Sequence, residues 1–147
     1  MPVTIQEAAE ALRARQFSSV ELTTAALGRI ARLNATLRTF ITVTAEAALE
    51  KAAQADSELA GGRDRGPLHG IPIAVKDLFF TRGVRTTAGS LLYRDFVPGH
   101  DAAVVERLER AGAVMMGKTN MHELAYGITS ENPHFGAVRN PDRKSVV

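Results

Sequence analysis

The chain has 147 residues without a cysteine, of which 45% are hydrophobic and 23% charged. This length fits one compact domain, and the composition argues against both a disordered and a membrane protein. The formal net charge is only +2 and charges of both signs are interspersed, so we expect no direct contact with nucleic acid. The absence of cysteine excludes disulfides, thiolate metal sites and a cysteine nucleophile. With neither a secretory signal nor an apolar run of roughly 20 residues, a cytoplasmic protein with no membrane partner is expected.

Residues 1–62 are predicted to form a mostly helical N-terminal segment. Two capping boxes, each a Ser or Thr followed three residues later by Glu, predict helices over residues 5–15 and from residue 18 to about 33. β-branched and aromatic residues at 40–43 predict a short strand. An alanine-rich stretch predicts a third helix over 45–60. The cap and stop residues are Thr4 with Glu7, Ser18 with Glu21, Thr44, and Gly61 with Gly62.

Residues 63–147 are predicted to form an α/β core within the same domain. The apolar run 71–75 is too short for a helix and predicts a buried strand, whose proline leaves one side of its start unpaired. A helix over 102–111 and a strand over 113–116 follow, so the unit is a parallel crossover. The expected helix caps are Asp101 and Gly112, and the side chains expected to face inward are Val104, Val105 and Leu108.

Residues 112–119 match the phosphate-loop pattern G-x-x-x-x-G-K-[ST] letter for letter. A phosphate loop needs a strand before its first glycine and a loop between the glycines, so that backbone N–H groups surround phosphate. Here a predicted helix precedes the first glycine, and the four intervening residues are apolar. We therefore predict against nucleotide binding and keep it as the weakest alternative.

The histidines do not form a metal site in the sequence pattern. His122-Glu123 begins like a zinc-protease helix, but Tyr126 stands where the second histidine would be needed. The other histidines lie in predicted loops without ligand spacing, and we expect them to be structural or solvent-facing. They are His69, His100 and His134. No metal and no cofactor are predicted.

Lys76 ends the apolar strand and directly precedes Asp77. From the local sequence alone, the favoured interpretation is a strand-end lysine that extends to water or pairs with Asp77. The alternative is a functional lysine, because lysine is rarely buried without a use.

Four ordered words decide between these interpretations: GPLHGIPIAVKD at 66–77, TAGS at 87–90, GKTNM at 117–121 and NPHFG at 132–136. In this order and spacing they resemble the amidase-signature family, across nearly the whole chain and most densely from 66 to 141. The resemblance implies the N-terminal part of an α/β fold with a mixed sheet flanked by helices.

The resemblance also implies a mechanism. Similar enzymes cleave amides with a Ser, cis-Ser, Lys triad, and Lys76 occupies the position of the base. In the family both serines lie within and after a Gly-Gly-Ser-Ser-Gly-Gly-Ser stretch that follows an Asn-Pro word, and residues 140–147 contain no such stretch. Ser145 has no flanking glycines and receives no catalytic role. We therefore expect a fragment with an incomplete core that is inactive alone.

Ala125, Tyr126 and Gly127 correspond to the family segment that lines the acyl pocket, and they are the candidate contacts for a small-molecule amide. An equally favoured interpretation makes Leu124 and Tyr126 ordinary packing residues. Thr119, Asn120 and Met121 are expected to fix the turn after the preceding strand.

Three functions stay open besides the weak nucleotide-binding alternative. The leading one is amide hydrolysis, and a close alternative is the glutaminase subunit of glutamyl-tRNA amidotransferase. Tyr126 stands where that subunit commonly has methionine, which favours a general amidase. The third is a non-catalytic remnant or oligomerising module, because an exposed sheet edge would favour a homo-oligomer.

Overall fold

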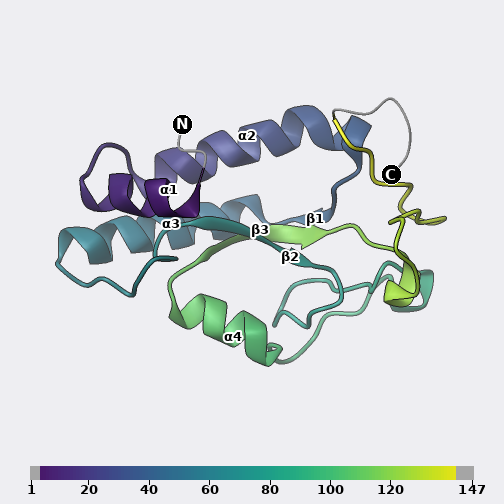
Figure 1. Ribbon diagram of the computed structural model, residues 1–147. Coiled ribbons are helices and arrows are strands. Elements are labelled where there is room, and N and C mark those ends of the chain that lie inside the picture. The colour runs from purple at the N-terminus through teal and green to yellow at the C-terminus, as the bar shows by residue number, and fades with distance from the viewer. Residues whose placement is uncertain (1–3, 142–147) are drawn as a thin grey trace.

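A computed structural model describes residues 4–141 as a three-stranded sheet with helices on both faces (Figure 1). The strand order is β1-β3-β2, with β1 antiparallel and β2 parallel to β3. The helices are α1 Ile5–Arg13, α2 Ser19–Leu37, α3 Ala45–Ala60 and α4 Ala103–Arg110; the strands are β1 Phe40–Val43, β2 Pro72–Lys76 and β3 Val114–Thr119; two short 3-10 helices are η1 Leu91–Tyr93 and η2 Glu123–Ala125. The α/β class, the mixed sheet and the parallel crossover are confirmed.

The first three helices follow from local sequence. Both capping boxes are formed, with the Thr4 and Ser18 side chains each accepting from the N–H of the glutamate three residues on. The first helix ends two residues earlier than predicted, before Arg15 at φ 54°. The second continues to Leu37 and ends at a left-handed Arg38. The third has the predicted bounds.

Neither of the other two predicted N-cap residues forms a side-chain capping bond, because each side chain bonds elsewhere. Thr44 occupies the N-cap position of α3 as predicted, but its hydroxyl donates to the Met115 carbonyl at 3.2 Å. Ala102, not Asp101, occupies the N-cap of α4, and Asp101 Oδ1 accepts from the Arg82 N–H at 2.6 Å. Both side chains therefore join segments distant in sequence.

The helices and strands bury their apolar residues in two clusters on the α1–α3 side of the sheet, the upper side in Figure 1. One cluster joins α1 to the start of β2 through Leu12 and Ile71. The other joins α3 to β3 through Ala48, Ala52 and Val114, all fully buried. Small alanines let α3 approach the central strand closely.

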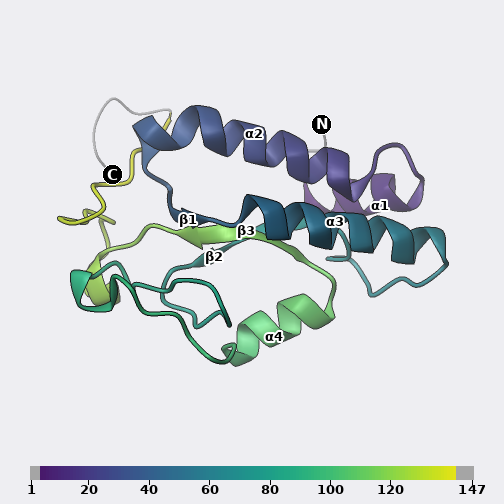
Figure 2. The same ribbon diagram turned by 180° about the vertical axis from the view of Figure 1, so that it is seen from behind.

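On the opposite face, α4 covers the sheet less completely (Figure 2). Val105 is buried as predicted, but Val104 is 41% exposed, so its predicted inward orientation is wrong. Leu108 is half-buried.

The two crossover strands begin one residue later than predicted, and β3 extends three residues further, to Thr119. In the described sheet β2 is an edge strand, which agrees with the unpaired side expected from Pro72. The extra length of β3 includes Gly117, whose φ is +151° and where a Cβ atom would overlap the Thr42 carbonyl oxygen of β1. Glycine is required there because the neighbouring strand approaches so closely.

Candidate active site

Lys76 lies at the carboxyl end of β2 with an exposed side chain. Its backbone pairs in register with Thr119, whereas the preceding Val75 pairs with Lys118. Because side chains alternate along a strand, Lys76 points to one face and Val75, Asp77 and Lys118 to the other. Within residues 4–141 the Lys76 ammonium has no ion-pair or hydrogen-bond partner. The expectation that it pairs with Asp77 is therefore wrong, and the expectation of an exposed strand-end lysine is confirmed.

Asp77 is fully buried and organises the chain that follows Lys76. Its Oδ2 accepts from the Thr87 N–H at 2.9 Å and from the Thr87 hydroxyl. Its backbone N–H donates to Thr119 at 3.2 Å, and its carbonyl accepts from the Ala88 N–H at 3.0 Å. One side chain and both backbone groups thus fix the residue next to Lys76 against β3 and against residues 86–90, which we name the strap.

The strap continues the connection to the segment that carries the predicted substrate contacts. The Leu124 N–H donates to the Ala88 carbonyl at 2.8 Å, and the Ser90 hydroxyl donates to Glu123 Oε1 at 2.6 Å. Asn132 Nδ2 donates to the carbonyls of Gly89 at 2.7 Å and Met121 at 2.8 Å. The strap is therefore held between the end of β2 and the start of residues 121–127.

Residues 124–127 form an irregular, outward-facing turn. Leu124 and Ala125 have left-handed φ values of 53° and 59°, and Tyr126 is 92% exposed. A Cβ atom at Gly127 would overlap the His122 ring, so only glycine fits there without displacing the imidazole. The structure thus places Ala125, Tyr126 and Gly127 on the strand-end side of the molecule where β2 leads into the strap. The interpretation of Tyr126 as a packing residue is not met within the described residues.

Two charged groups beside this region have shifted pKa values. Burial lowers the pKa of Lys118 from its ordinary value, and the attraction of the Asp77 carboxylate opposes the shift. The Ser90 hydroxyl bond lowers the pKa of Glu123, with further lowering from the His134 ring at 3.1 Å. Glu123 is thus a carboxylate that holds two donors in place.

The sequence profile described as Amidase matches residues 21–147. The chain belongs to the amidase family. It is 54% identical over 144 residues to the A-subunit of the glutamyl-tRNA(Gln) amidotransferase of Methylococcus capsulatus, a match covering 98% of this chain and 30% of that protein. The corresponding protein of Azotobacter vinelandii is 54% identical over 139 residues, covering 95% and 29%. The chain thus spans under a third of the length of these curated relatives.

Solved amidase structures share the fold. The native peptide amidase of Stenotrophomonas maltophilia superposes with a TM-score of 0.88 at 40% identity, covering 96% of this chain and 30% of that chain. A fatty acid amide hydrolase superposes with a TM-score of 0.87 at 26% identity, covering 95% and 25%. The family resemblance carried by the four sequence words is confirmed.

In this chain of the amidase family, the residues that match the phosphate-loop pattern, 112–119, have other structural roles. Residues 114–119 are strand, so the backbone N–H groups between the two glycines are not arranged around a phosphate. Gly112 has φ +76° after the end of α4, and a Cβ there would overlap the His69 ring. Lys118 is fully buried beneath the strap. The prediction against a phosphate loop is confirmed.

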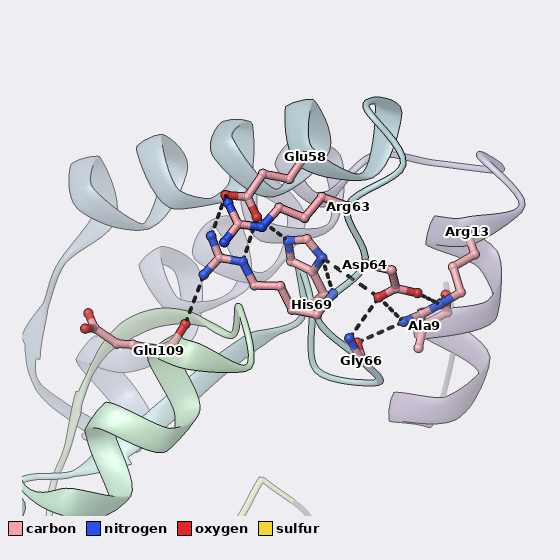
Figure 3. Close-up of polar contacts among 9 residues, drawn as sticks. Ala9, Arg13, Glu58, Arg63, Asp64, Gly66, His69 and Glu109 are labelled. Atoms are coloured by element: carbon pink, nitrogen blue, oxygen red, sulfur yellow. Dashed lines mark hydrogen bonds and ion pairs between the residues drawn. The ribbon is translucent and has the colours of Figure 1, made fainter.

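A second polar network lies beside α3 (Figure 3). Glu58 accepts from the Arg65 guanidinium at 2.6 Å through Nε, and its Oε2 lies 3.2 Å from His69 Nε2. The Arg65 bond lowers the pKa of Glu58 to about 2, and burial lowers the pKa of His69. His69 is 1% exposed, which confirms a structural role for it. Arg13 and Asp64 continue the network to α1 at 2.7 Å.

A cavity of about 190 Å³ opens beside this network, lined by residues of α3, the 65–69 loop and the 81–84 loop.

Among the described residues no group of three His, Cys, Asp or Glu side chains is placed to hold a metal ion. In that same part of the chain, no helix combines the length and the apolar character needed to cross a membrane. Ser145 lies outside the described residues.

Sequence reasoning singled out Lys76 and the 125–127 segment as candidates but missed the strap, the element whose hydrogen bonds join them. The word TAGS at 87–90 was its visible signal. Its buried anchors, Thr87 and Ser90, are both fully inaccessible to solvent. Asn132 was likewise quoted only as part of a word, although it is 4% exposed and uses its amide in four hydrogen bonds.

Proposed function

We propose that these residues form the base-bearing part of an amide-hydrolysing site, with Lys76 as the base of a Ser, cis-Ser, Lys triad. The observation that carries the proposal is the placement of Lys76. Its side chain is exposed at a strand end, while Asp77 behind it is fully buried and bonded through side chain and backbone. A lysine with a fixed backbone, whose side chain has no bonded partner among residues 4–141, is suited to receive and return a proton once its amine is neutral.

The chemistry requires a neutral amine, because an ammonium cannot accept a proton. In general, exclusion of water from an amine favours its neutral form. The amine then takes a proton from the bridging serine, which takes one from the nucleophilic serine as its oxygen attacks the amide carbonyl. Backbone N–H groups stabilise the oxyanion, and the proton returns to the leaving nitrogen. The proposal requires both serines to come from polypeptide other than residues 4–141.

We propose glutamine as the first amide to test. The curated relatives cited above are amidotransferase subunits at 54% identity, whereas the peptide amidase structure is 40% identical. Tyr126 favours the second candidate, a general amidase, because its large side chain is 92% exposed and would occupy part of an acyl pocket. A Tyr126→Met variant then tests whether Tyr126 lines the acyl pocket or takes no part in substrate binding.

Further parts of the proposal concern assembly. We propose that residues 1–62 and 63–147 build one domain, because β1 of the first part pairs with β3 of the second. The described edges of the sheet, β1 and β2, are the places at which a second copy of the chain would pair. We also propose a cytoplasmic location, which agrees with the names of relatives that refer to a transfer RNA.

The test uses the complete enzyme. This is the whole protein encoded by the reading frame that contains these residues. If that frame ends at Val147, the enzyme tested is a fusion of these residues to the remaining part of the Methylococcus capsulatus A-subunit. Ammonia release is measured from glutamine and from a simple carboxamide, with Lys76→Ala beside Lys51→Met, an exposed lysine of α3. Loss of release in Lys76→Ala alone supports the proposal. Full activity in Lys76→Ala overturns it, and the preferred amide decides between glutaminase and general amidase.

A further inference from the structure

Lys118 is a fully buried lysine that the proposed reaction does not use. Its Nζ donates to the Phe79 carbonyl at 2.6 Å and to the Thr86 hydroxyl at 2.7 Å, and lies 3.7 Å from Asp77 Oδ1. A buried ammonium is costly unless its partners compensate, and an apolar residue of similar volume often gives equal or greater stability. Stability alone is therefore a weak reason for a lysine here.

Lys118 cannot act on substrate directly from the face that bears Lys76. It pairs in register with Val75, so its side chain lies on the opposite face of the sheet. Its side chain is instead linked to Lys76 through the backbone that follows Lys76.

That backbone path is short. The Phe79 N–H donates to the Lys76 carbonyl at 3.1 Å, which closes a turn directly after the base. The carbonyl of the same Phe79 is the group that Lys118 binds. One residue therefore closes the turn with its N–H and holds the buried ammonium with its carbonyl.

The same ammonium also reaches the strap. Thr86 begins the strap, and Asp77, which faces Lys118, holds the next residue by two hydrogen bonds. Ala88 and Ser90 of the strap then bind Leu124 and Glu123, directly before the candidate substrate contacts. Lys118 is thus bonded both to the turn after Lys76 and to the strap, and the strap binds the residues directly before the 125–127 segment.

We propose that Lys118 is a positioning residue, which sets the Lys76 amine relative to the 125–127 segment by tying the Lys76–Phe79 turn to the strap. This inference rests on the proposed function of Lys76. Misplacement of a reacting group by about 1 Å can lower a rate by about 100-fold, so a junction of this kind has kinetic consequences.

The test combines kinetics of the complete enzyme with hydrogen exchange. Lys118→Met removes the donors and keeps much of the volume; Thr86→Val removes one acceptor and leaves the ion pair intact, so it serves if the first variant fails to fold. Lys51→Met is the matched control. For each, kcat is expressed per folded molecule, because a purely structural defect would lower the folded fraction and leave that value unchanged.

We expect kcat to fall at least about tenfold with KM changed less than about threefold, as for loss of orientation rather than binding. Exchange should quicken at the Ala88 and Leu124 amides and stay unchanged at Ala48 in α3. A kcat within twofold of the wild type, a rise in KM alone, or unchanged exchange at both strap amides overturns the inference. Loss of activity in Lys76→Ala with a fully active, folded Lys118→Met overturns this inference only; full activity in Lys76→Ala overturns both proposals.

Discussion

Substitution of Gly117 by alanine tests the packing of the central strand. The residue sits in β3 at φ +151°, and an added Cβ would overlap the Thr42 carbonyl oxygen and lie 3.0 Å from Val43 Cα. The obstacle is backbone of the neighbouring strand, which cannot move without breaking the β1–β3 ladder. A side chain at such a φ costs about 1–3 kcal/mol, and overpacking adds about 1–3 kcal/mol.

Gly117→Ala should therefore destabilise the protein by about 2–6 kcal/mol, the sum of the two costs. At about 4 °C per kcal/mol for a chain of this size, Tm falls by about 8–24 °C. Thermal unfolding followed by circular dichroism measures the shift. The matched control is Gly28→Ala in α2, whose nearest obstacle is a flexible arginine tip at 3.6 Å. That variant should gain about 0.5–1 kcal/mol from helix propensity.

A Gly117→Ala protein whose Tm lies within about 2 °C of the wild type would refute the packing argument, since even the smallest expected cost gives a larger shift. Glycine at that position would then need another explanation, and the phosphate-loop pattern would regain interest. A loss of stability in Gly117→Ala, together with the small gain expected for Gly28→Ala, supports the close approach of the two strands.

Three further outcomes follow from the same contacts. Glu58→Gln should lower the free energy of unfolding at neutral pH, because the pKa of Glu58 is lowered from 4.5 to about 2 in the folded protein. The difference in free energy of unfolding between the variant and the wild type should shrink as pH falls from about 4.5 towards 2, in denaturant titrations at each pH. Ser90→Ala should raise the pKa of Glu123 towards its ordinary value in a carboxyl NMR titration, and an unchanged titration contradicts the hydroxyl bond. Asn132→Ala should cost about 2–4 kcal/mol, because buried carbonyls and N–H groups lose their partners, while the exposed Gln6→Ala should cost under about 0.5 kcal/mol in urea unfolding.

Local sequence predicted the parts of the fold that local forces determine. The capping boxes at Thr4 and Ser18 depend on residues three apart, and both formed as expected. Asp101 shows the limit of such reasoning. Its carboxylate had two possible donors, the start of α4 or the Arg82 N–H nineteen residues earlier, and only the assembled fold brings the second one within 2.6 Å.

The candidate site shows the same boundary. Lys76 was recognised because its word is contiguous, and its exposure follows from strand alternation. Lys118 lies in an equally conspicuous word, yet its role depends on Asp77, Phe79 and Thr86, more than thirty residues earlier. Pairings over such separations leave no periodic signal in the sequence, so its burial could not be predicted.

The strand order also has a consequence for how the chain is made. The central strand β3 is the last of the three in sequence, so the two outer strands have no described partner in the sheet until Thr119 has been synthesised. At about 5–20 residues per second, roughly 4–15 s separate the synthesis of β1 from that of β3. During this interval the alanine face of α3 lacks the strand that later covers it. The sheet therefore cannot form on the ribosome until β3 has been synthesised.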